Sequence, residues 1–216
     1  MTDKPHAPAT ERNRDPILAE LRALFADHQR VLEIGSGTGQ HAVFFAAALS
    51  HLVWQCSDRA ENLPGIRLWL ADAGLANTPA PLALDVIRDP WPSERYDAVF
   101  SANTLHIMPW QAVEALFAGL PAVLHPSATV AIYGPFNRNG IATSDSNAAF
   151  DAKLRSEQPH MGLRDVEAVD ALAQATGLAL IADIAMPANN ALRVWRLAVS
   201  GQVGPRVRTS PAIPMR

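Results

Sequence analysis

Glu33-Ile34-Gly35-Ser36-Gly37-Thr38-Gly39 is the stretch from which the fold can be inferred. The apolar run Arg30–Ile34 before the glycines predicts a short buried strand, and the alanine-rich residues 40–49 after them predict a helix. A second predicted strand at 52–56 completes a strand–helix–strand unit, which favours a parallel pair. Glycines at such a turn let the backbone approach a ligand closely, while the following helix presents its first N–H groups.

The same alternation of strands and helices continues along the chain without a repeat or an interdomain linker. Asp15 suits the N-cap of a first helix and Pro16 its first helical position. Further helices are predicted at 63–73, 110–120, 147–155 and 165–176, and further strands at 82–84, 96–101, 129–133, 178–184 and 191–199. About seven strands alternating with about six helices predict one α/β domain with a doubly wound sheet. We place this domain at residues 11–200, between a flexible N-terminal segment (1–10) and a flexible C-terminal tail (201–216).

Composition excludes several classes of protein. The 216 residues are 49% hydrophobic and 18% charged, a globular composition, and 18 Lys and Arg against 21 Asp and Glu leave no excess of basic residues for binding a nucleic acid. The one cysteine, Cys56, excludes a disulfide within the chain, and seven scattered histidines show no metal-ligand spacing. No signal peptide or membrane-spanning stretch is evident. We therefore expect a cytoplasmic protein with a small-molecule substrate and no metal, nucleic-acid or membrane partner; the oligomeric state stays open, with a homodimer as one option.

The glycine spacing separates this turn from two common nucleotide-binding motifs. It lacks the Gly-Lys-Ser/Thr ending of a phosphate loop, and glycines at 35, 37 and 39 followed by Gln40 do not fit the dinucleotide pattern G-x-G-x-x-G. It instead resembles motif I of class I S-adenosylmethionine-dependent methyltransferases. That resemblance implies a Rossmann-like, seven-stranded, mostly parallel sheet with the last strand antiparallel. It also implies that Asp58 binds the ribose hydroxyls and that Asp85 contacts the adenine; the structural alternative for each is a solvated aspartate in a turn.

Polar residues also follow the predicted fourth and fifth strands, on the edge of the sheet where a ligand is expected. Asn103 and His106 come after the fourth strand, and Tyr133 ends the fifth. His106 has the side chain of a general base near neutral pH, although a buried histidine that only bonds to backbone is the commoner case. Adjacent Asn189 and Asn190 are typical of a turn.

Nearly the whole chain, from about residue 7 to 198, is similar to an uncharacterised methyltransferase-like family, domain of unknown function 938, which includes the methyltransferase-like 26 proteins. The resemblance rests on sequence blocks spread along the chain: Ala9–Asn13, Leu32–His41, Trp54 with Ser57-Asp58, Leu84-Asp85-Val86, Trp91-Pro92, Asn103, Leu105-His106-Ile107, Pro109-Trp110, Tyr133-Gly134-Pro135-Phe136, Ser146–Asp151, Leu154-Arg155, Gly162, Arg164-Asp165 and Met186–Asn190.

The methyltransferase resemblance and the polar residues at the strand ends together give the candidate site residues. The cofactor candidates are Glu33, Gly35, Ser36, Gly37, Thr38, Gly39, His41, Asp58, Asp85, Val86 and Asn103. The catalytic candidates are His106, Asn103 and Tyr133. The candidates for binding the acceptor are Arg12, Asn13, Tyr133, Phe136, Asn147, Arg164, Asn189 and Asn190. Each of the acceptor candidates has a plain structural alternative as a surface, core or turn residue.

The sequence thus favours an S-adenosylmethionine-dependent methyltransferase that acts on a small polar or anionic molecule. Arg, Tyr and Asn side chains suit such an acceptor, because a guanidinium pairs with carboxylates. A non-catalytic protein that binds S-adenosylmethionine or serves as a scaffold on the same fold is the alternative. An NAD-dependent oxidoreductase is a third and weaker option, because the glycine spacing disfavours it.

Overall fold

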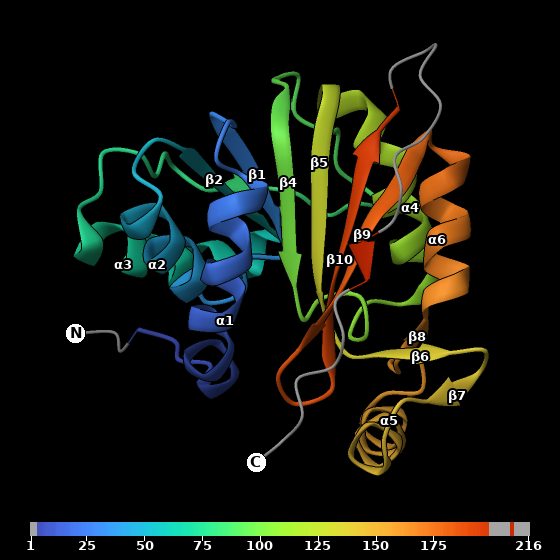
Figure 1. Ribbon diagram of the computed structural model, residues 1–216. Coiled ribbons are helices and arrows are strands. Elements are labelled where there is room, and N and C mark those ends of the chain that lie inside the picture. The colour runs from blue at the N-terminus through green and yellow to red at the C-terminus, as the bar shows by residue number, and fades with distance from the viewer. Residues whose placement is uncertain (1–3, 199–207, 210–216) are drawn as a thin grey trace.

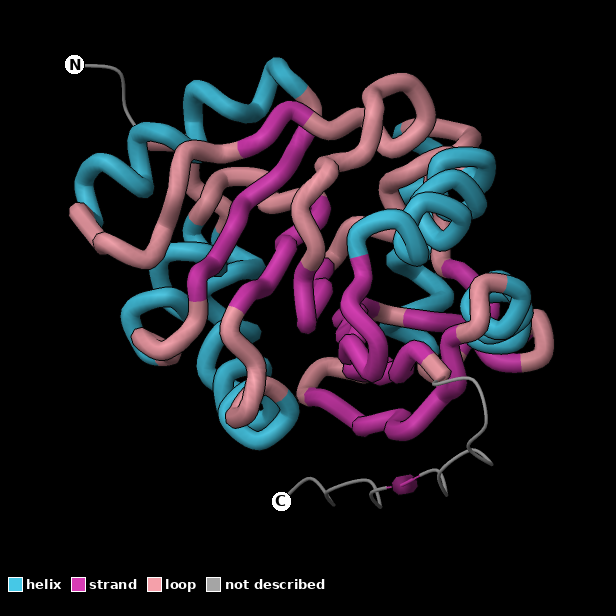
Figure 2. The backbone as a smooth tube through the Cα atoms, turned by 90° about the horizontal axis from the view of Figure 1, so that it is seen from above, coloured by secondary structure: helices cyan, strands magenta, loops and turns pink. Residues whose placement is uncertain are grey.

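A computed structural model describes residues 4–198 and 208–209 and shows one large sheet between two layers of helices (Figures 1 and 2). Seven strands follow the order β3-β2-β1-β4-β5-β10-β9, and two-residue β11 pairs with the outer side of β9. Only β10 runs antiparallel to its neighbours, so the predicted sheet is confirmed. The strands are β1 (Arg30–Ile34), β2 (Val53–Asp58), β3 (Leu82–Ala83), β4 (Tyr96–Ala102), β5 (Leu124–Gly134), β9 (Leu178–Met186), β10 (Asn190–Leu197) and β11 (Arg208–Thr209).

The helices cover both faces of the sheet. One apolar core joins helices α1, α2 and α3 to one face, and a second core joins α4 and α6 to the other. The bounds are α1 (Pro8–Leu24), α2 (Gln40–Ala48), α3 (Leu63–Ala73), α4 (Trp110–Val123), α5 (Asp145–Glu157), α6 (Val166–Ala175) and the 3-10 turn η1 (Ala60–Asn62). The end of α3 follows from sequence, because Gly74 adopts the left-handed conformation (φ 59°) that terminates a helix.

The chain connections create a crevice between β1 and β4. From β1 the chain moves outward through β2 to β3, and it then returns to place β4 on the other side of β1. Ligands of doubly wound sheets bind at this reversal, outside the carboxyl ends of the strands. In Figure 1 these ends point downward, toward the first turns of α1 and toward α5.

Helix α1 begins earlier than predicted. Pro8 occupies its first turn, Ala7 precedes it, and the predicted first position, Pro16, lies inside the helix. A proline in a helix removes one backbone N–H, which is why the sequence pattern favoured a start at Pro16. Tertiary contacts compensate: the Ala7 N–H donates to Gln40 Oε1 at 2.6 Å, ahead of the first turn. Of the predicted flexible segment, residues 4–10 are described, and its mobility stays a prediction.

The segment from Gly134 to Asn147, which the sequence left as a long polar loop, contains two short strands. They are β6 (Phe136–Arg138) and β7 (Ile141–Ala142), which form a separate small sheet with β8 (Arg164–Asp165). Two or three residues are too few to show an alternating pattern, so sequence reasoning missed them. Helix α5 then begins after Ser144, whose Oγ accepts the N–H of Asn147 at 3.1 Å.

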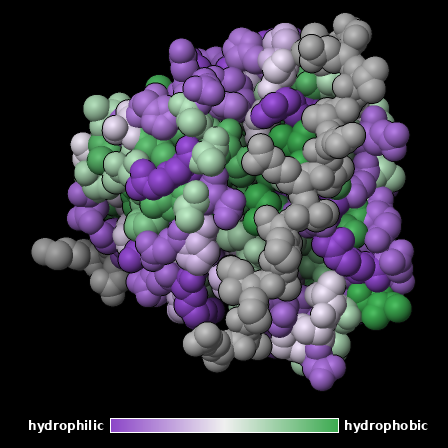
Figure 3. All heavy atoms as spheres, viewed as in Figure 1, coloured by the Kyte–Doolittle hydropathy of each residue, from purple (hydrophilic) through white to green (hydrophobic). Residues whose placement is uncertain are grey.

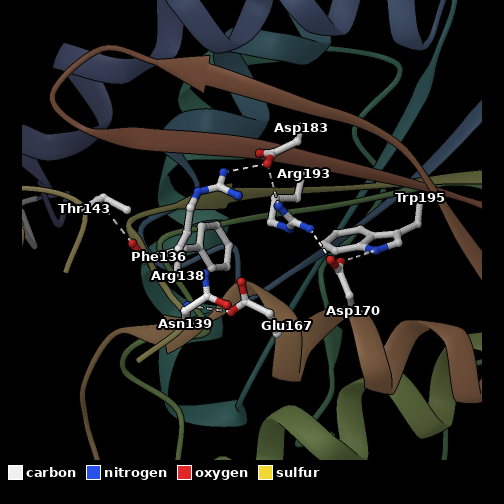
Figure 4. Close-up of polar contacts among 9 residues, drawn as sticks. All are labelled: Phe136, Arg138, Asn139, Thr143, Glu167, Asp170, Asp183, Arg193 and Trp195. Atoms are coloured by element: carbon white, nitrogen blue, oxygen red, sulfur yellow. Dashed lines mark hydrogen bonds and ion pairs between the residues drawn. The ribbon is translucent and has the colours of Figure 1, made fainter. Parts of the chain in front are cut away.

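A charged network fastens the small sheet to the large one (Figure 4). Arg193 of β10 is only 1% exposed, and it contacts Asp183 of β9 at 2.9 Å as well as Asp170 of α6. Asp170 also accepts Trp195 Nε1–H at 3.0 Å, and Arg138 of β6 binds Asp183. A buried arginine needs such paired carboxylates, because an unpaired charge in a core is costly.

The surface carries mixed polar and apolar residues, as Figure 3 shows for one face. The hydrophobic group at its lower right lies where Figure 1 draws β7, and Ile141 of that strand is 70% exposed. None of the helices in the described ranges is long and apolar enough to cross a membrane. Most of the predicted C-terminal tail lies outside the described residues.

Candidate functional site

A cavity of about 1130 Å³ opens at the carboxyl ends of β1, β2 and β4. It lies at the reversal of strand order between β1 and β4, and a cavity of this size can hold a small molecule. Six stretches of chain form its wall: residues 5–10 at the start of α1, 34–41 after β1, 58–65 after β2, 84–88 after β3, 102–112 after β4 and 158–161 between α5 and β8.

The glycine turn forms the floor of this cavity. Gly35 has φ 72°, and a Cβ on it would lie 2.7 Å from Thr104 Cγ2, so this position requires glycine. Gly37 has φ 58°, and within the described part of the chain no atom beyond its two neighbours lies within 4 Å of the place a Cβ would take. The backbone at Gly37 therefore faces open space in the cavity, where a ligand can approach it directly.

Asp58 holds the other side of the turn. Its Oδ2 accepts the Gly37 N–H at 2.7 Å, and its Oδ1 accepts the Arg59 N–H at 2.7 Å and Asn62 Nδ2–H at 2.8 Å. A carboxylate has about four acceptor positions, so three donors leave capacity for another hydroxyl. Asp58 is fixed in place and can still bind a ligand.

Glu33 lies behind the turn and does not line the cavity. Its Oε2 accepts Trp54 Nε1–H and Ser36 Oγ–H, both at 3.0 Å, and the side chain is 1% exposed. Burial raises the pKa of Glu33 to about 7; the two hydrogen bonds oppose this rise, and the nearby Asp58 adds to it. Gly39 also lies behind the cavity, where a Cβ would be 3.2 Å from Ile66 Cα of α3.

His41 lines the cavity, but its ring is already engaged. Its Nε2 lies 2.7 Å from Asn13 Oδ1, and the ring stacks on Phe45 with centroids 5.2 Å apart. Burial, reinforced by the charge of Arg14, lowers the pKa of His41 to about 4. Burial likewise raises the pKa of Tyr133 to about 12, while hydrogen bonding to Asn13 opposes the rise. Asn13 thus joins α1 to α2 and β5 outside the cavity.

Asp85, Val86 and Asn103 lie in the cavity wall, and their predicted role in binding the cofactor stays a prediction. Asp85 Oδ1 accepts the Ile87 N–H at 3.0 Å, which shapes the turn after β3. Asn103 has a left-handed backbone (φ 56°), and its N–H donates to Tyr133 O at 2.9 Å. Asparagine tolerates this conformation better than most residues, and such backbone positions concentrate at functional sites.

His106 lies just behind the wall, in a buried position. Its ring meets Phe150 edge-on with centroids 5.5 Å apart, and its carbonyl accepts the Gly162 N–H at 2.9 Å. Burial is the main cause that lowers the pKa of His106 to about 4, and the charge of Arg164 adds to it. His106 is therefore neutral at pH 7.

Arg164 connects two parts of the wall without lining the cavity. Its Nε donates to Leu105 O at 3.0 Å, and its Nη2 donates to Met108 O and to His160 O. Met108 and His160 both line the cavity, on separate stretches of chain. The guanidinium therefore holds these two stretches together through their carbonyl oxygens.

The remaining candidates for binding an acceptor also lie outside the cavity. Asn147 Nδ2 donates to Thr143 Oγ1 at 2.8 Å and to Asn189 O at 2.9 Å. Asn190 Nδ2 donates to the carbonyls of Pro187 and Ala188 within its own turn. Phe136 is buried in the core and Arg12 is exposed. The roles predicted for these residues toward an acceptor stay predictions.

Sequence reasoning missed several residues of the wall. Thr10, Ile107, Met108, Gln158, His160 and Met161 all line the cavity. Residues 158–161 reach it because Gly162 N–H binds the carbonyl of His106 and because Arg164 binds the carbonyl of His160. The first contact joins two backbone groups and the second ends on a backbone carbonyl, so neither could be read from residue types and spacing.

A model of the family described as "Protein of unknown function (DUF938)" matches residues 4–197. Among solved structures, the apo form of the S-adenosylmethionine-dependent methyltransferase SibL is 22% identical, with a TM-score of 0.75 over 92% of this chain and 56% of that one. An O-methyltransferase family protein from Burkholderia thailandensis is 16% identical (TM-score 0.77; 90% and 58% covered). An O-methyltransferase family 2 protein from Planctomyces limnophilus, in complex with apigenin, is 16% identical (TM-score 0.74; 88% and 58%). The chain thus spans little more than half the length of these structures and shares their fold.

Proposed function

The chain belongs to the family of unknown function DUF938, and on that premise we propose that it is an S-adenosylmethionine-dependent methyltransferase acting on a small molecule. The observation that carries the proposal is the open backbone of Gly37 beside the immobilised carboxylate of Asp58. The fold shared with structures named as methyltransferases supports it as well.

The residues of the cavity fit this cofactor. The turn at Gly35–Thr38 offers space and backbone groups for the amino-acid end, and Asp58 retains capacity for the ribose hydroxyls. Asp85 and Val86 line the cavity after the next strand, which supports the proposal that they contact the adenine. Ser36, Thr38, His41 and Asn103 complete the proposed cofactor wall, whereas Glu33 and Gly39 support the turn from behind.

The chain's part in methyl transfer is to position the two reactants. The cofactor supplies a methyl group already activated on a sulfonium, so holding the acceptor in line accounts for much of the barrier reduction. Asn103 is the one of the three catalytic candidates that lines the cavity. Catalytic roles for His106 and Tyr133 stay predictions; the pKa of His106, about 4, keeps its ring neutral at pH 7 but makes it a weak base.

For the acceptor, we keep the predicted small polar or anionic molecule. Its support in the cavity comes from Thr10, Gln158 and His160, which supply polar groups in place of the expected arginines and asparagines. One matched structure holds apigenin, and a small-molecule acceptor agrees with this. The cytoplasmic location and the oligomeric state stay predictions.

Calorimetry with S-adenosylmethionine and with S-adenosylhomocysteine tests the proposal. The wild-type protein should bind both, and Asp58→Ala should weaken both about 100-fold, because it removes hydrogen bonds to a charged acceptor. Asp27→Ala, at an exposed carboxylate near the opposite end of β1, is the matched control and should change nothing. Absence of binding at millimolar ligand would refute the proposal.

A measurement of turnover distinguishes the proposed enzyme from the alternative, a non-catalytic binding protein or scaffold. Transfer of a labelled methyl group from the cofactor to any component of a metabolite extract supports the enzyme. Cofactor binding without transfer to any component favours the alternative.

A further inference from the structure

We propose that Glu33 makes the site selective for charge: its buried carboxylate favours the cationic sulfonium cofactor over the neutral demethylated product, S-adenosylhomocysteine. This inference rests on the proposed function and concerns a residue outside the cavity wall. Its consequence is easier release of the product after methyl transfer.

Glu33 is coupled to the cavity through one residue. Ser36 lines the cavity, and its hydroxyl donates to Glu33 Oε2 at 3.0 Å from inside the glycine turn. The N–H groups of Gly35 and Ser36 both bind Ser57 O, at 3.0 and 3.1 Å, and Ser57 Oγ donates to the Glu33 carbonyl at 2.7 Å. The carboxylate is thus held directly behind the turn that faces the cofactor.

No cation of the described residues pairs with this carboxylate. The ion pairs of that part of the chain include neither Glu33 nor Asp58, so two carboxylates flank the turn without a counter-charge. Of the two arginines in the cavity wall, Arg59 pairs with Glu61 at 3.1 Å and Arg88 is exposed. A ligand with a positive charge is therefore favoured at this turn.

The ionisable neighbours of Glu33 do not neutralise it. Asp58 and Cys56 of β2 are its nearest ones, and burial raises the pKa of Cys56, so the thiol is uncharged. On the α2 side, Trp54 and Phe45 lie between Glu33 and His41, whose lowered pKa leaves it neutral at pH 7. The charge on Glu33 thus depends on its own proton and on what binds in front of the turn.

Because Glu33 is buried, the ionisation of its carboxyl group responds to the charge of a ligand near neutral pH. With its pKa raised to about 7, the group is divided between the acid and the carboxylate at pH 7. A cation in the cavity favours the carboxylate and expels the proton, whereas the neutral product does not. Binding of S-adenosylmethionine should therefore release part of a proton and should tighten as pH rises from 6 to 8, relative to the product.

Calorimetry in buffers of different ionisation enthalpy measures both effects. Glu33→Gln keeps an acceptor oxygen for Trp54 and Ser36, because both donors bind the same atom, Oε2. We expect it to abolish the extra proton release with S-adenosylmethionine and to lower the preference for cofactor over product about tenfold, which corresponds to two unit charges about 12 Å apart at an effective dielectric near 20. Asp97→Asn is the control, since Asp97 binds Gln29 and Arg30 N–H at the far end of β1.

The outcomes separate this inference from the proposed function. Failure of the wild type to bind either ligand refutes the methyltransferase proposal itself. Binding of both ligands, with Glu33→Gln weakening them equally and leaving the proton release unchanged, refutes only the role of Glu33.

Trp54→Phe provides a second test that keeps the carboxylate. It removes a donor that favours the charged form, so the proton release should move to higher pH. An unmoved pH profile would contradict the inference even if Glu33→Gln failed to fold.

Discussion

The two halves of the cavity rim use similar residues for different purposes. On the side of β1 to β4, Asp58, Asp85 and Asn103 lie in the cavity wall. On the side of β5 to β10, Arg164 and Asn147 donate hydrogen bonds to carbonyl and hydroxyl oxygens of neighbouring loops. A polar side chain at the end of a strand is thus a candidate for binding a ligand only where the neighbouring loops leave some of its hydrogen-bonding groups free.

The largest expected effect distinguishes stability from binding. Arg164→Met removes three hydrogen bonds from a charged donor to the carbonyls of Leu105, Met108 and His160, so the free energy of unfolding should fall by about 3 kcal/mol. Affinity for S-adenosylmethionine should change only a few-fold. Urea denaturation and calorimetry measure the two quantities.

Arg155→Met is the matched control for this arginine. Arg155 pairs with Asp151 on the exposed surface of α5, where an ion pair contributes less than about 1 kcal/mol. If Arg164→Met kept its stability and lost its ligand, the second half of the rim would be a binding surface like the first.

Acid stability should depend on two buried histidines, His41 in the cavity wall and His106 just behind it. Folding lowers the pKa of His41 and of His106 from 6.5 to about 4. Between these values the unfolded chain binds protons that the folded chain excludes, so the free energy of unfolding decreases as pH falls from 6.5 to 4. Each histidine should account for about 3 kcal/mol of that decrease, since its pKa falls by about 2.5 units and one unit corresponds to 1.36 kcal/mol.

His41→Gln and His106→Gln should each flatten this dependence, as measured by denaturation at pH 7 and pH 4.5. Only His41 lines the cavity, so only its variant should also weaken cofactor binding. Equal losses of cofactor affinity in both variants would contradict the distinction between a histidine in the cavity wall and a histidine behind it.

The parts of the molecule that the sequence could predict are those set by local signals. The strand Arg30–Ile34 and the helix Leu63–Ala73 have the predicted bounds. Their signals are local: an apolar run before glycines indicates the strand, and a proline at the start and a glycine after the end indicate the helix. The wall residues on β1 to β4 follow in the same way, since the carboxyl ends of parallel strands meet at one edge.

The features that the sequence did not predict depend on contacts that are not local. Pro8 rather than Pro16 begins α1, where the N-terminal segment binds Gln40. Gly162 brings residues 158–161 to the cavity through a backbone bond to His106. Neither contact changes which side chains the sequence shows, so composition and spacing could not reveal them.

The smallest expected effect compares two asparagines with the same backbone. Asn103 and Asn189 both have φ 56°, which glycine adopts freely, so Asn103→Gly and Asn189→Gly should each change the free energy of unfolding by no more than about 0.5 kcal/mol. Asn189 Nδ2 donates to the exposed Ser146 Oγ, whereas Asn103 lies in the cavity wall. Only Asn103→Gly should therefore lower cofactor affinity, by about threefold, or about 0.6 kcal/mol. A loss of affinity in Asn189→Gly, measured by the same calorimetry, would place the turn between β9 and β10 in the site and extend the binding half of the rim around the whole edge of the sheet.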